Sequence, residues 1–133
     1  MYIPQFYIAL LSHPSMKKQA LIGLTALLLN CTPTPNYDTT PAKVQLAQCL
    51  AEKGAVMYGS EWCGWCSKQK KDFGEEAWEA FKNNYFNCEG SKDEQRLCDA
   101  KAIKSYPYWE FKDGKSRKGY QFLEDLAVIS GCR

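Results

Sequence analysis

Two cysteines separated by two residues, Cys63 and Cys66, carry the clearest chemistry in this sequence. They follow a short apolar run over residues 55–58 and open a polar, helix-prone stretch over residues 67–72, so we expect them at a strand-to-helix junction. A thiol at a helix N-terminus has a lowered pKa, because backbone N–H groups and the helix dipole favour the thiolate. The pattern predicts a reversible dithiol couple in which Cys63 is the nucleophile and Cys66 closes the disulfide.

The first 30 residues have the pattern of an export signal. Lys17 and Lys18 precede an apolar run over residues 20–29 that is too short to span a bilayer as a mature helix. We therefore expect translation to start at Met16, with residues 1–15 an over-extended gene model. The alternative is a genuine N-terminal extension with a membrane-associated helix.

The end of this leader, Leu28-Leu29-Asn30-Cys31, resembles a bacterial lipoprotein signal, in which the cysteine receives a lipid and becomes the new N-terminus. Asn30 stands where that signal usually has Gly, Ala or Ser. Residues 31–41 would follow as a tether, since their Pro and Thr content favours an extended, solvated spacer. The resemblance implies a lipid-anchored protein of the bacterial periplasm or cell envelope. Ordinary secretion with Cys31 left as a thiol is the alternative.

Removal of the leader changes the charge and the catalytic options. The chain has 17 Lys and Arg and 15 Asp and Glu, so without Lys17 and Lys18 the charges balance. A balanced charge gives no excess of positive charge that would indicate nucleic-acid binding. The only histidine, His13, leaves with the leader. This excludes Ser-His-Asp and Cys-His catalysis and any metal site that needs imidazole. The chemistry of the mature chain is therefore expected to depend on sulfur.

The chain has seven cysteines, and six remain for disulfides if Cys31 carries a lipid. An even number of cysteines suits disulfide pairing in an exported protein. The CxxC forms one pair by proximity, and Cys88 and Cys98 are the next most local couple. Cys49 and Cys132 are then left for each other. We expect both of these pairs to be structural disulfides. Two alternatives stay open: Cys88–Cys98 relays electrons to the CxxC, or Cys49 and Cys132 are free thiols.

Periodicity and capping signals predict one domain over residues 42–133. Pro41 suits the start of a helix, Gly54 and Gly74 suit helix ends, and Ser91 with Glu94 forms a capping box. We expect helices up to residue 53 and over residues 63–73, 75–82, 91–100 and 121–130. The expected strands are residues 55–58, 85–88, 107–111 and 115–118.

This order of elements resembles the thioredoxin fold, in which a parallel β-α-β unit precedes a β-hairpin and a closing helix. The stretch Trp62-Cys63-Gly64-Trp65-Cys66 matches the Trp-Cys-x-x-Cys active site of that family. Pro107 lies where the family places a cis-proline that faces the CxxC. The resemblance implies an α/β fold with a central mixed sheet of about four strands, flanked by helices.

A closer likeness is to the thioredoxin-like domain fused to bacterial homologues of vitamin K epoxide reductase. It rests on residues 57–63, the Cys88 and Cys98 pair, residues 105–109 and residues 123–128. The membrane-spanning oxidase portion is missing, so the likeness implies a separate soluble domain. It implies protein thiols and disulfides as substrates, and a vitamin K epoxide reductase-like membrane oxidase as a candidate partner.

The family resemblance also assigns roles. Cys63 would attack and form a mixed disulfide, and Cys66 would resolve it without a cofactor or a metal. Pro107 would hold the chain near Cys63 and leave the Tyr106 backbone free to pair with an extended peptide. The expected substrate contacts are Trp62, Gly64, Trp65 and Tyr106. Gly64-Trp65 has no histidine between the cysteines, so we expect a reduction potential below that of the most oxidising family members.

Two other functions remain as alternatives. The first is metal binding: a site built from Cys63, Cys66, Cys88 and Cys98, although the long spacing of the second pair suits structural zinc poorly, or copper transfer by Cys63 and Cys66 alone. The second is a non-catalytic envelope lipoprotein whose CxxC is a permanent bridge.

Overall fold

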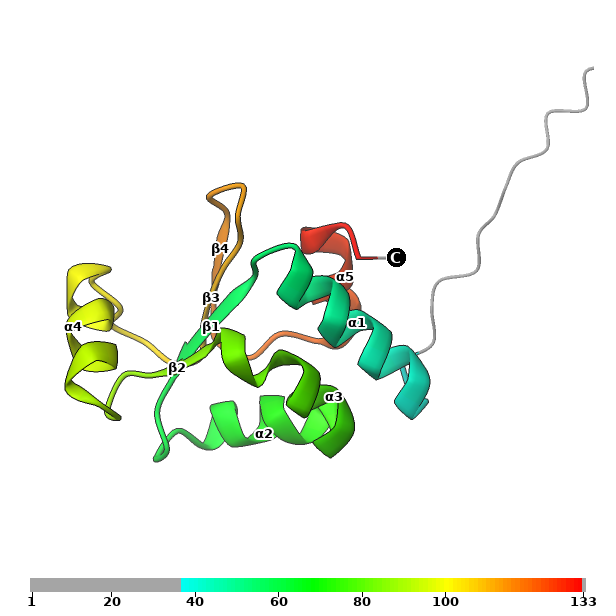
Figure 1. Cartoon of the computed structure of the whole chain (residues 1–133), viewed down its shortest axis with the longest axis horizontal. Helices are drawn as coiled ribbons and strands as arrows, with labels where there is room; N and C mark the ends of the chain where they lie inside the picture. Colours follow the sequence, from blue (N-terminus) through cyan, green and yellow to red (C-terminus); the bar gives the residue numbers. More distant parts are fainter. Residues whose placement is uncertain (1–36, 133) are drawn as a thin grey trace, which may run out of the picture. The chain divides into compact units, whose positions relative to one another are not determined.

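The computed structural model describes residues 37–132, which fold around a mixed sheet with the strand order β2-β1-β3-β4 (Figure 1). The central strand β1 (Val56–Gly59) pairs in parallel with β2 (Tyr85–Asn87). On its other side β1 pairs antiparallel with β3 (Tyr108–Glu110), and β3 pairs antiparallel with β4 (Ser116–Lys118). This is the thioredoxin-like α/β arrangement, and the fold class expected from the sequence is confirmed.

Helices contribute most of the remaining regular structure in this part of the chain. The helix α1 packs chiefly against α3 and also contacts α2 and α5, whereas α4 lies beside β2 at the other end of the sheet (Figure 1). Their bounds are α1 (Thr40–Glu52), α2 (Gly64–Phe73), α3 (Glu75–Phe81), α4 (Lys92–Ala100) and α5 (Leu123–Ser130). A short 3-10 turn, η1 (Lys82–Asn84), leads from α3 into β2.

The core is divided between the two faces of the sheet. Because successive strand residues point to opposite faces, Met57 and Trp109 belong to one buried cluster and Tyr58 to another. Helices α1, α2, α3 and α5 supply the first cluster, in which the rings of Phe73 and Phe81 stack with centroids 5.9 Å apart. The second cluster is Tyr58, Cys88, Cys98 and Ile103.

Local signals position most of the helix ends. Gly74 has φ of 81°, a conformation that favours glycine, and it separates α2 from α3. The capping box of Ser91 and Glu94 is present at the start of α4. The last helix begins at Leu123 rather than at Gln121 as expected, because the Gln121 backbone N–H and C=O are hydrogen-bonded to the buried side chain of Gln69.

The predicted leader over residues 1–30, the start at Met16 and Cys31 lie outside the described residues. Within the described end of the expected tether, Tyr37 is buried and its hydroxyl donates to the Cys132 carbonyl at 3.2 Å. The first turn of α1 begins at Thr40. Over residues 37–132, no helix combines the length and the apolar character needed to cross a membrane.

Candidate active site

Cys63 is the N-cap of α2, directly after the loop that leaves β1. Its sulfur accepts the backbone N–H of Cys66 at 3.1 Å, and its carbonyl accepts the N–H of Ser67 at 3.1 Å. Cys63 is partly exposed, whereas Cys66 is only 1% exposed. The helix N-terminus therefore presents one sulfur to solvent and keeps the other inside the protein.

The two sulfurs are bonded to each other, with the Cα atoms 5.2 Å apart. The N–H directed at the Cys63 sulfur and the positive end of the helix dipole both favour a thiolate once this disulfide is reduced. Reduction would thus produce a nucleophile at Cys63 with a second sulfur in bonding range.

Gly59 ends β1 at a point of close packing beneath the CxxC. A Cβ atom at this position would lie 3.0 Å from the Cys66 sulfur and 2.9 Å from the Tyr85 ring. Real Cβ atoms essentially never come closer than 3.0 Å to another heavy atom, so a side chain here would displace the Tyr85 ring or the backbone of Gly59. A glycine at the end of a strand is a known sign of close approach, and this one was not singled out from the sequence.

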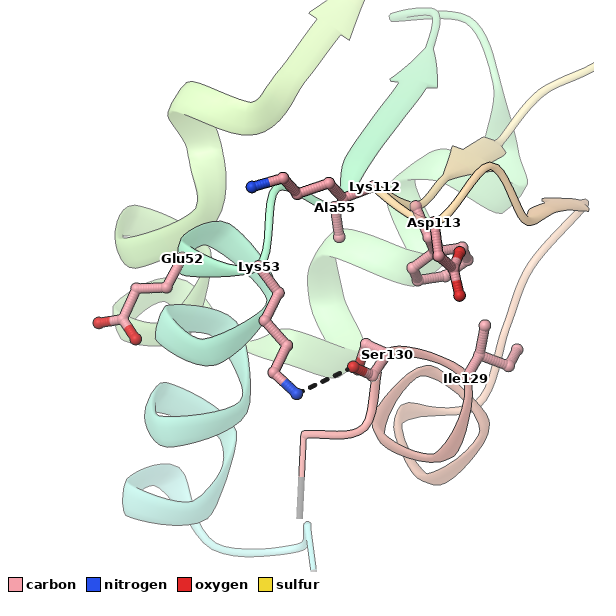
Figure 2. Close-up of a pocket in the computed structure, with 8 residues that line it drawn as sticks. Glu52, Lys53, Ala55, Lys112, Asp113, Ile129 and Ser130 are labelled. Atoms are coloured by element: carbon pink, nitrogen blue, oxygen red, sulfur yellow. Dashed lines mark hydrogen bonds between the residues drawn. The ribbon is translucent and has the colours of Figure 1, made fainter.

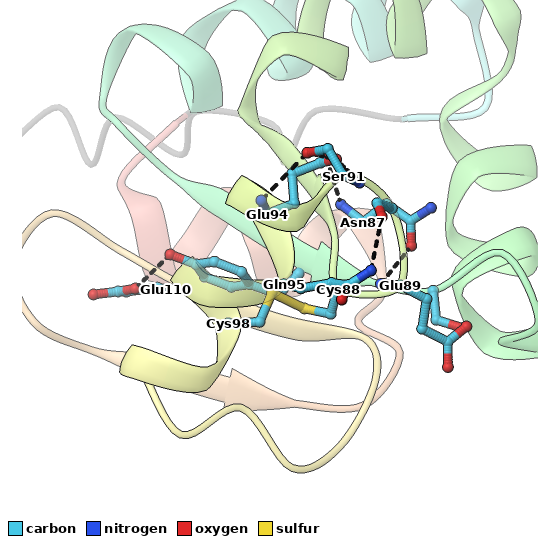
Figure 3. Close-up of a disulfide and its surroundings, with 11 residues drawn as sticks. Asn87, Cys88, Glu89, Ser91, Glu94, Gln95, Cys98 and Glu110 are labelled. Carbon is cyan, nitrogen blue, oxygen red and sulfur yellow. Dashed lines mark hydrogen bonds between the residues drawn. A yellow bond between two sulfur atoms is a disulfide. The ribbon is translucent and has the colours of Figure 1, made fainter.

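The loop between β1 and α2 is held by residues that sequence reasoning missed. The Ser60 hydroxyl is buried, donates to the Glu89 carboxylate at 2.7 Å and accepts the Trp62 N–H at 3.1 Å. The Asn87 amide donates to Glu61 at 3.4 Å, and its carbonyl oxygen accepts the Glu89 N–H (Figure 3). These contacts join the CxxC loop to the segment after β2, and no sequence motif marks them.

Pro107 lies at the same end of the strands as the CxxC loop. Tyr108 pairs with Tyr58, so Pro107 is opposite Gly59, the last residue of β1, directly before the loop begins. Pro107 is fully buried, and the Tyr106–Pro107 peptide bond is cis. Burial, with a smaller contribution from the Glu89 carboxylate, raises the pKa of the adjacent Tyr106.

Exposed aromatic side chains surround the CxxC. Trp62 is 89% exposed and Trp65 is 61% exposed, which is unusual for tryptophan. The Trp65 ring contacts Tyr120 at a centroid distance of 6.0 Å, and Tyr120 contacts Phe122 at 5.3 Å. We call Trp65, Tyr120 and Phe122 the aromatic row. Sequence reasoning named Trp62 and Trp65 but missed Tyr120 and Phe122, which precede the last helix and are brought here by the tertiary structure. Gly64 lies exposed between the cysteines.

The aromatic row is anchored to α2 through polar contacts. The Tyr120 hydroxyl donates to the Asp72 carboxylate, and Lys68 forms an ion pair with Asp72 at 2.7 Å. The Lys68 ammonium also lies 4.1 Å from the centre of the Tyr120 ring. Burial favours a higher pKa for Asp72, but the hydrogen bonds from Lys68 and Tyr120 outweigh it and lower the pKa.

The other four cysteines form two further disulfides. Cys88 and Cys98 join the end of β2 to α4 in the second core cluster (Figure 3), and Cys49 and Cys132 join α1 to the chain after α5. Cys66 packs in the first cluster, so the CxxC and the Cys88–Cys98 pair lie in different parts of the core. Residues 37–132 contain no group of three or more His, Cys, Asp or Glu side chains arranged to hold a metal ion.

One hollow in this part of the structure has no CxxC residue in its lining. It has a volume of about 460 Å³ and is formed by the end of α1, the β3–β4 turn and the end of α5 (Figure 2). Lys53 crosses it and donates to the carbonyls of Ser130 and Gly131 at 3.1 and 2.8 Å. A cation at a helix C-terminus is stabilising, so the hollow has a structural explanation.

Fold and site together define this domain as thioredoxin-like, with a CxxC disulfide at the N-terminus of the helix that follows the central strand. No protein-family model matches the chain. The chain is 37% identical over 100 residues to "Thiol-disulfide oxidoreductase LTO1" of Arabidopsis thaliana, a match that covers 71% of this chain and 26% of that protein. The match thus spans about a quarter of the relative's length.

Proposed function

We propose that this protein is a thiol–disulfide oxidoreductase that exchanges disulfides with protein substrates through Cys63 and Cys66. The observation that carries the proposal is the placement of the two sulfurs: Cys63 is partly exposed at the N-terminus of α2, and it is bonded to a buried Cys66. The similarity to a protein named as a thiol-disulfide oxidoreductase supports the same activity.

The reaction needs only the two cysteines. In the reducing direction, the Cys63 thiolate attacks one sulfur of a substrate disulfide, forms a mixed disulfide and releases the other sulfur as a thiolate. Cys66 then attacks the Cys63 sulfur, the Cys63–Cys66 bond forms, and the second substrate thiolate leaves. Two electrons pass from the pair to the substrate. The reverse sequence donates the disulfide, and the potential of the partner couple sets the direction.

Substrate would bind beside Cys63, where apolar side chains lie near backbone groups that could form hydrogen bonds with it. The exposed rings of Trp62, Trp65 and Phe122 and the partly exposed ring of Tyr120 supply the apolar surface, and aromatic side chains of this kind are enriched in protein interfaces. Tyr106 would offer its backbone to an extended segment of substrate next to Pro107. Gly64 would allow that segment to approach, since it carries no side chain.

The sequence and the disulfides support a proposal for the cellular setting. We propose export through residues 1–30, with a start at Met16, and attachment to the bacterial cell envelope by a lipid on Cys31. Two disulfides besides the CxxC suit an oxidising, extracytoplasmic compartment. The likeness to domains fused to vitamin K epoxide reductase homologues supports a membrane oxidase of that kind as the redox partner.

The decisive test is trapping with Cys66→Ser. This change removes the sulfur that resolves the mixed disulfide, so substrate should remain bound to Cys63 and be released only by a reductant. We expect covalent adducts to be recovered from cells of the native host and identified by mass spectrometry. Trapped secreted proteins would indicate substrates, and a trapped membrane protein would identify the redox partner.

The matched control is Cys63→Ala, which should abolish adducts and reduce disulfide exchange with a model protein substrate to the uncatalysed rate while the fold is retained. Full function in this variant would contradict the proposal and favour a structural CxxC. Metal bound stoichiometrically to the reduced chain and lost in Cys63→Ala would favour the metal-binding alternative.

A further inference from the structure

Two buried polar groups face each other across Gly59. The Tyr85 hydroxyl oxygen and the Cys66 sulfur lie 3.1 and 3.0 Å from the position that a Cβ of Gly59 would occupy, so the two atoms are no more than about 6 Å apart. Residue 59 places no side chain between them, because it is glycine. Tyr85 is the first residue of β2, and Cys66 lies in the first turn of α2.

The Tyr85 hydroxyl is buried and has no hydrogen-bond partner within the described residues. A buried hydroxyl without a partner is costly, and nearly all such groups in proteins are paired. Its ring is held in place, since Trp78 makes an edge contact at 5.4 Å and the Lys70 ammonium lies 3.9 Å from the ring centre. The side chain thus has a fixed orientation, with its polar end directed at the place where Gly59 and Cys66 meet.

Reduction of the Cys63–Cys66 disulfide would supply the hydrogen-bond acceptor that the Tyr85 hydroxyl lacks. In the disulfide, the Cys66 sulfur is uncharged and accepts hydrogen bonds poorly. After reduction, the thiolate form of Cys66 must attack Cys63, and its charge is unfavourable at a site that is 1% exposed. A hydrogen-bond donor beside it would stabilise that charge without a need for solvent.

Tyr85 is suited to donate a proton in a hydrogen bond rather than to act as a base. Burial, with the nearby carboxylates of Glu61, Glu94 and Glu89, raises its pKa to about 12, so it stays protonated at neutral pH. Tyr106 makes a smaller contribution that also raises the pKa of Tyr85. The ammonium of Lys70 is the cation nearest to the Tyr85 ring among the described contacts.

We propose that Tyr85 donates a hydrogen bond to the Cys66 thiolate in the reduced protein and so prepares Cys66 to resolve the mixed disulfide on Cys63. The inference rests on the proposed function and extends it. In the resolving step Cys66 bonds to the Cys63 sulfur, the substrate sulfur leaves as a thiolate with its electron pair, and the Tyr85 hydroxyl loses its acceptor. No proton passes to or from Tyr85.

The test is Tyr85→Phe, which retains the ring, in the full chain with Cys63→Ala so that Cys66 is the only thiol of the pair. The pKa of Cys66 is read from its 13Cβ chemical shift as a function of pH. We expect the pKa to rise by about one unit, that is, about a tenfold lower thiolate fraction at a given pH below it, because a hydrogen bond to the charged form is lost. In a chain that keeps both Cys63 and Cys66, Tyr85→Phe should slow resolution of a preformed mixed disulfide on Cys63 about tenfold.

Tyr58→Phe is the matched control, since it removes another buried tyrosine hydroxyl, one that donates to Glu110 at 3.1 Å in the second core cluster. It should leave the pKa of Cys66 unchanged. An unaltered pKa in Tyr85→Phe, or an equal shift in both variants, would overturn the inference.

A second measurement needs no substitution of Tyr85. Reduction of the native chain should shift the 13Cζ resonance of Tyr85 as its hydroxyl gains an acceptor, and should leave that of Tyr58 in place. An unchanged Tyr85 resonance would overturn the inference. Loss of the proposed function has a different signature: the native chain would exchange no disulfides, whereas the Cys66 pKa would still report the hydrogen bond.

Discussion

Cys63 and Cys66 have the same side chain and differ in their surroundings. Cys63 occupies the N-cap and receives a backbone N–H, whereas Cys66 is one turn further along the helix and is packed against Gly59 and the core. Exposure allows the first sulfur to meet a substrate, and burial protects the second from unwanted oxidation. The proposed division of roles between an attacking Cys63 and a resolving Cys66 thus has a physical basis in their positions.

Gly59→Ala should test how tightly Cys66 is packed. The new Cβ would lie 3.0 Å from the Cys66 sulfur and 2.9 Å from the Tyr85 ring, so the Tyr85 ring or the backbone of Gly59 must move. Gly59 does not have a positive φ, so the cost is steric. We expect the free energy of unfolding to fall by about 1–3 kcal/mol, measured with denaturant, and disulfide exchange to slow.

Gly64→Ala is the matched control for stability, because a Cβ there meets nothing within 4 Å and alanine is favoured in helices. It should leave the free energy of unfolding equal or slightly higher. A Gly59 variant as stable as this control would contradict the close packing described above.

At the scale of elements, α4 is the helix whose start is most clearly encoded. Ser91 accepts the Glu94 N–H, and the Glu94 carboxylate accepts the backbone N–H groups of Ser91 and Asn87 (Figure 3). These backbone hydrogen bonds, that from Asn87 first, lower the pKa of Glu94. Because Asn87 ends β2, the same carboxylate also connects the helix to the sheet.

Removal of the capping box should destabilise the protein in a pH-dependent way. Ser91→Ala should cost about 1 kcal/mol of unfolding free energy at neutral pH. The pKa of Glu94 is lower in the folded state than its ordinary value of 4.5, so its contribution is present above that value and is lost as the pH falls through the lowered pKa. Denaturant titrations at several pH values should show this acid loss, and Glu94→Gln should diminish it.

Asp93→Asn is the control for this helix turn, since Asp93 is exposed and forms an ion pair with Arg96 on the surface. Its effect on stability should be small. An equal acid loss in Glu94→Gln and in the native chain would show that the capping carboxylate is not its source.

At the scale of the whole molecule, the two ends of the described domain are joined. The Cys49–Cys132 disulfide links residues 83 positions apart, the Tyr37 hydroxyl donates to the Cys132 carbonyl, and Lys53 donates to the end of α5. These contacts hold α5 against α1 on the same side of the sheet as the CxxC helix (Figure 1). The disulfide therefore stabilises the layer that supports the site.

Replacement of both cysteines by alanine, Cys49→Ala with Cys132→Ala, should lower the free energy of unfolding by about 4 kcal/mol, because the unfolded chain regains the entropy of a long loop. Denaturant unfolding of the oxidised protein measures the change. The paired change Cys88→Ala with Cys98→Ala is the comparison, since its sequence separation is 10 and the expected loss is about 3 kcal/mol. A smaller loss for the longer loop would contradict the chain-entropy explanation.

The order of the helices and strands could be predicted largely because its signals are local, and the fold class came from the resemblance of that order to the thioredoxin fold. Pro41, Gly74 and the Ser91–Glu94 box act within one helix turn, and they mark helix ends that the structure contains. The start of α5 was placed two residues too early, because nothing near Gln121 in sequence shows that Gln69 binds its backbone. Errors of this kind arise where a side chain distant in sequence competes for backbone hydrogen bonds.

The sequence alone determined that a CxxC pair follows a buried strand and begins a helix, since thiolate stabilisation at a helix N-terminus depends on neighbouring residues only. Tertiary structure decided what surrounds the pair. Ser60 contacts Glu89, and Tyr85 and Cys66 both pack against Gly59, only because β1 and β2 pair in one register. Such contacts join residues far apart in the chain, and strand pairing and packing select them rather than any local pattern.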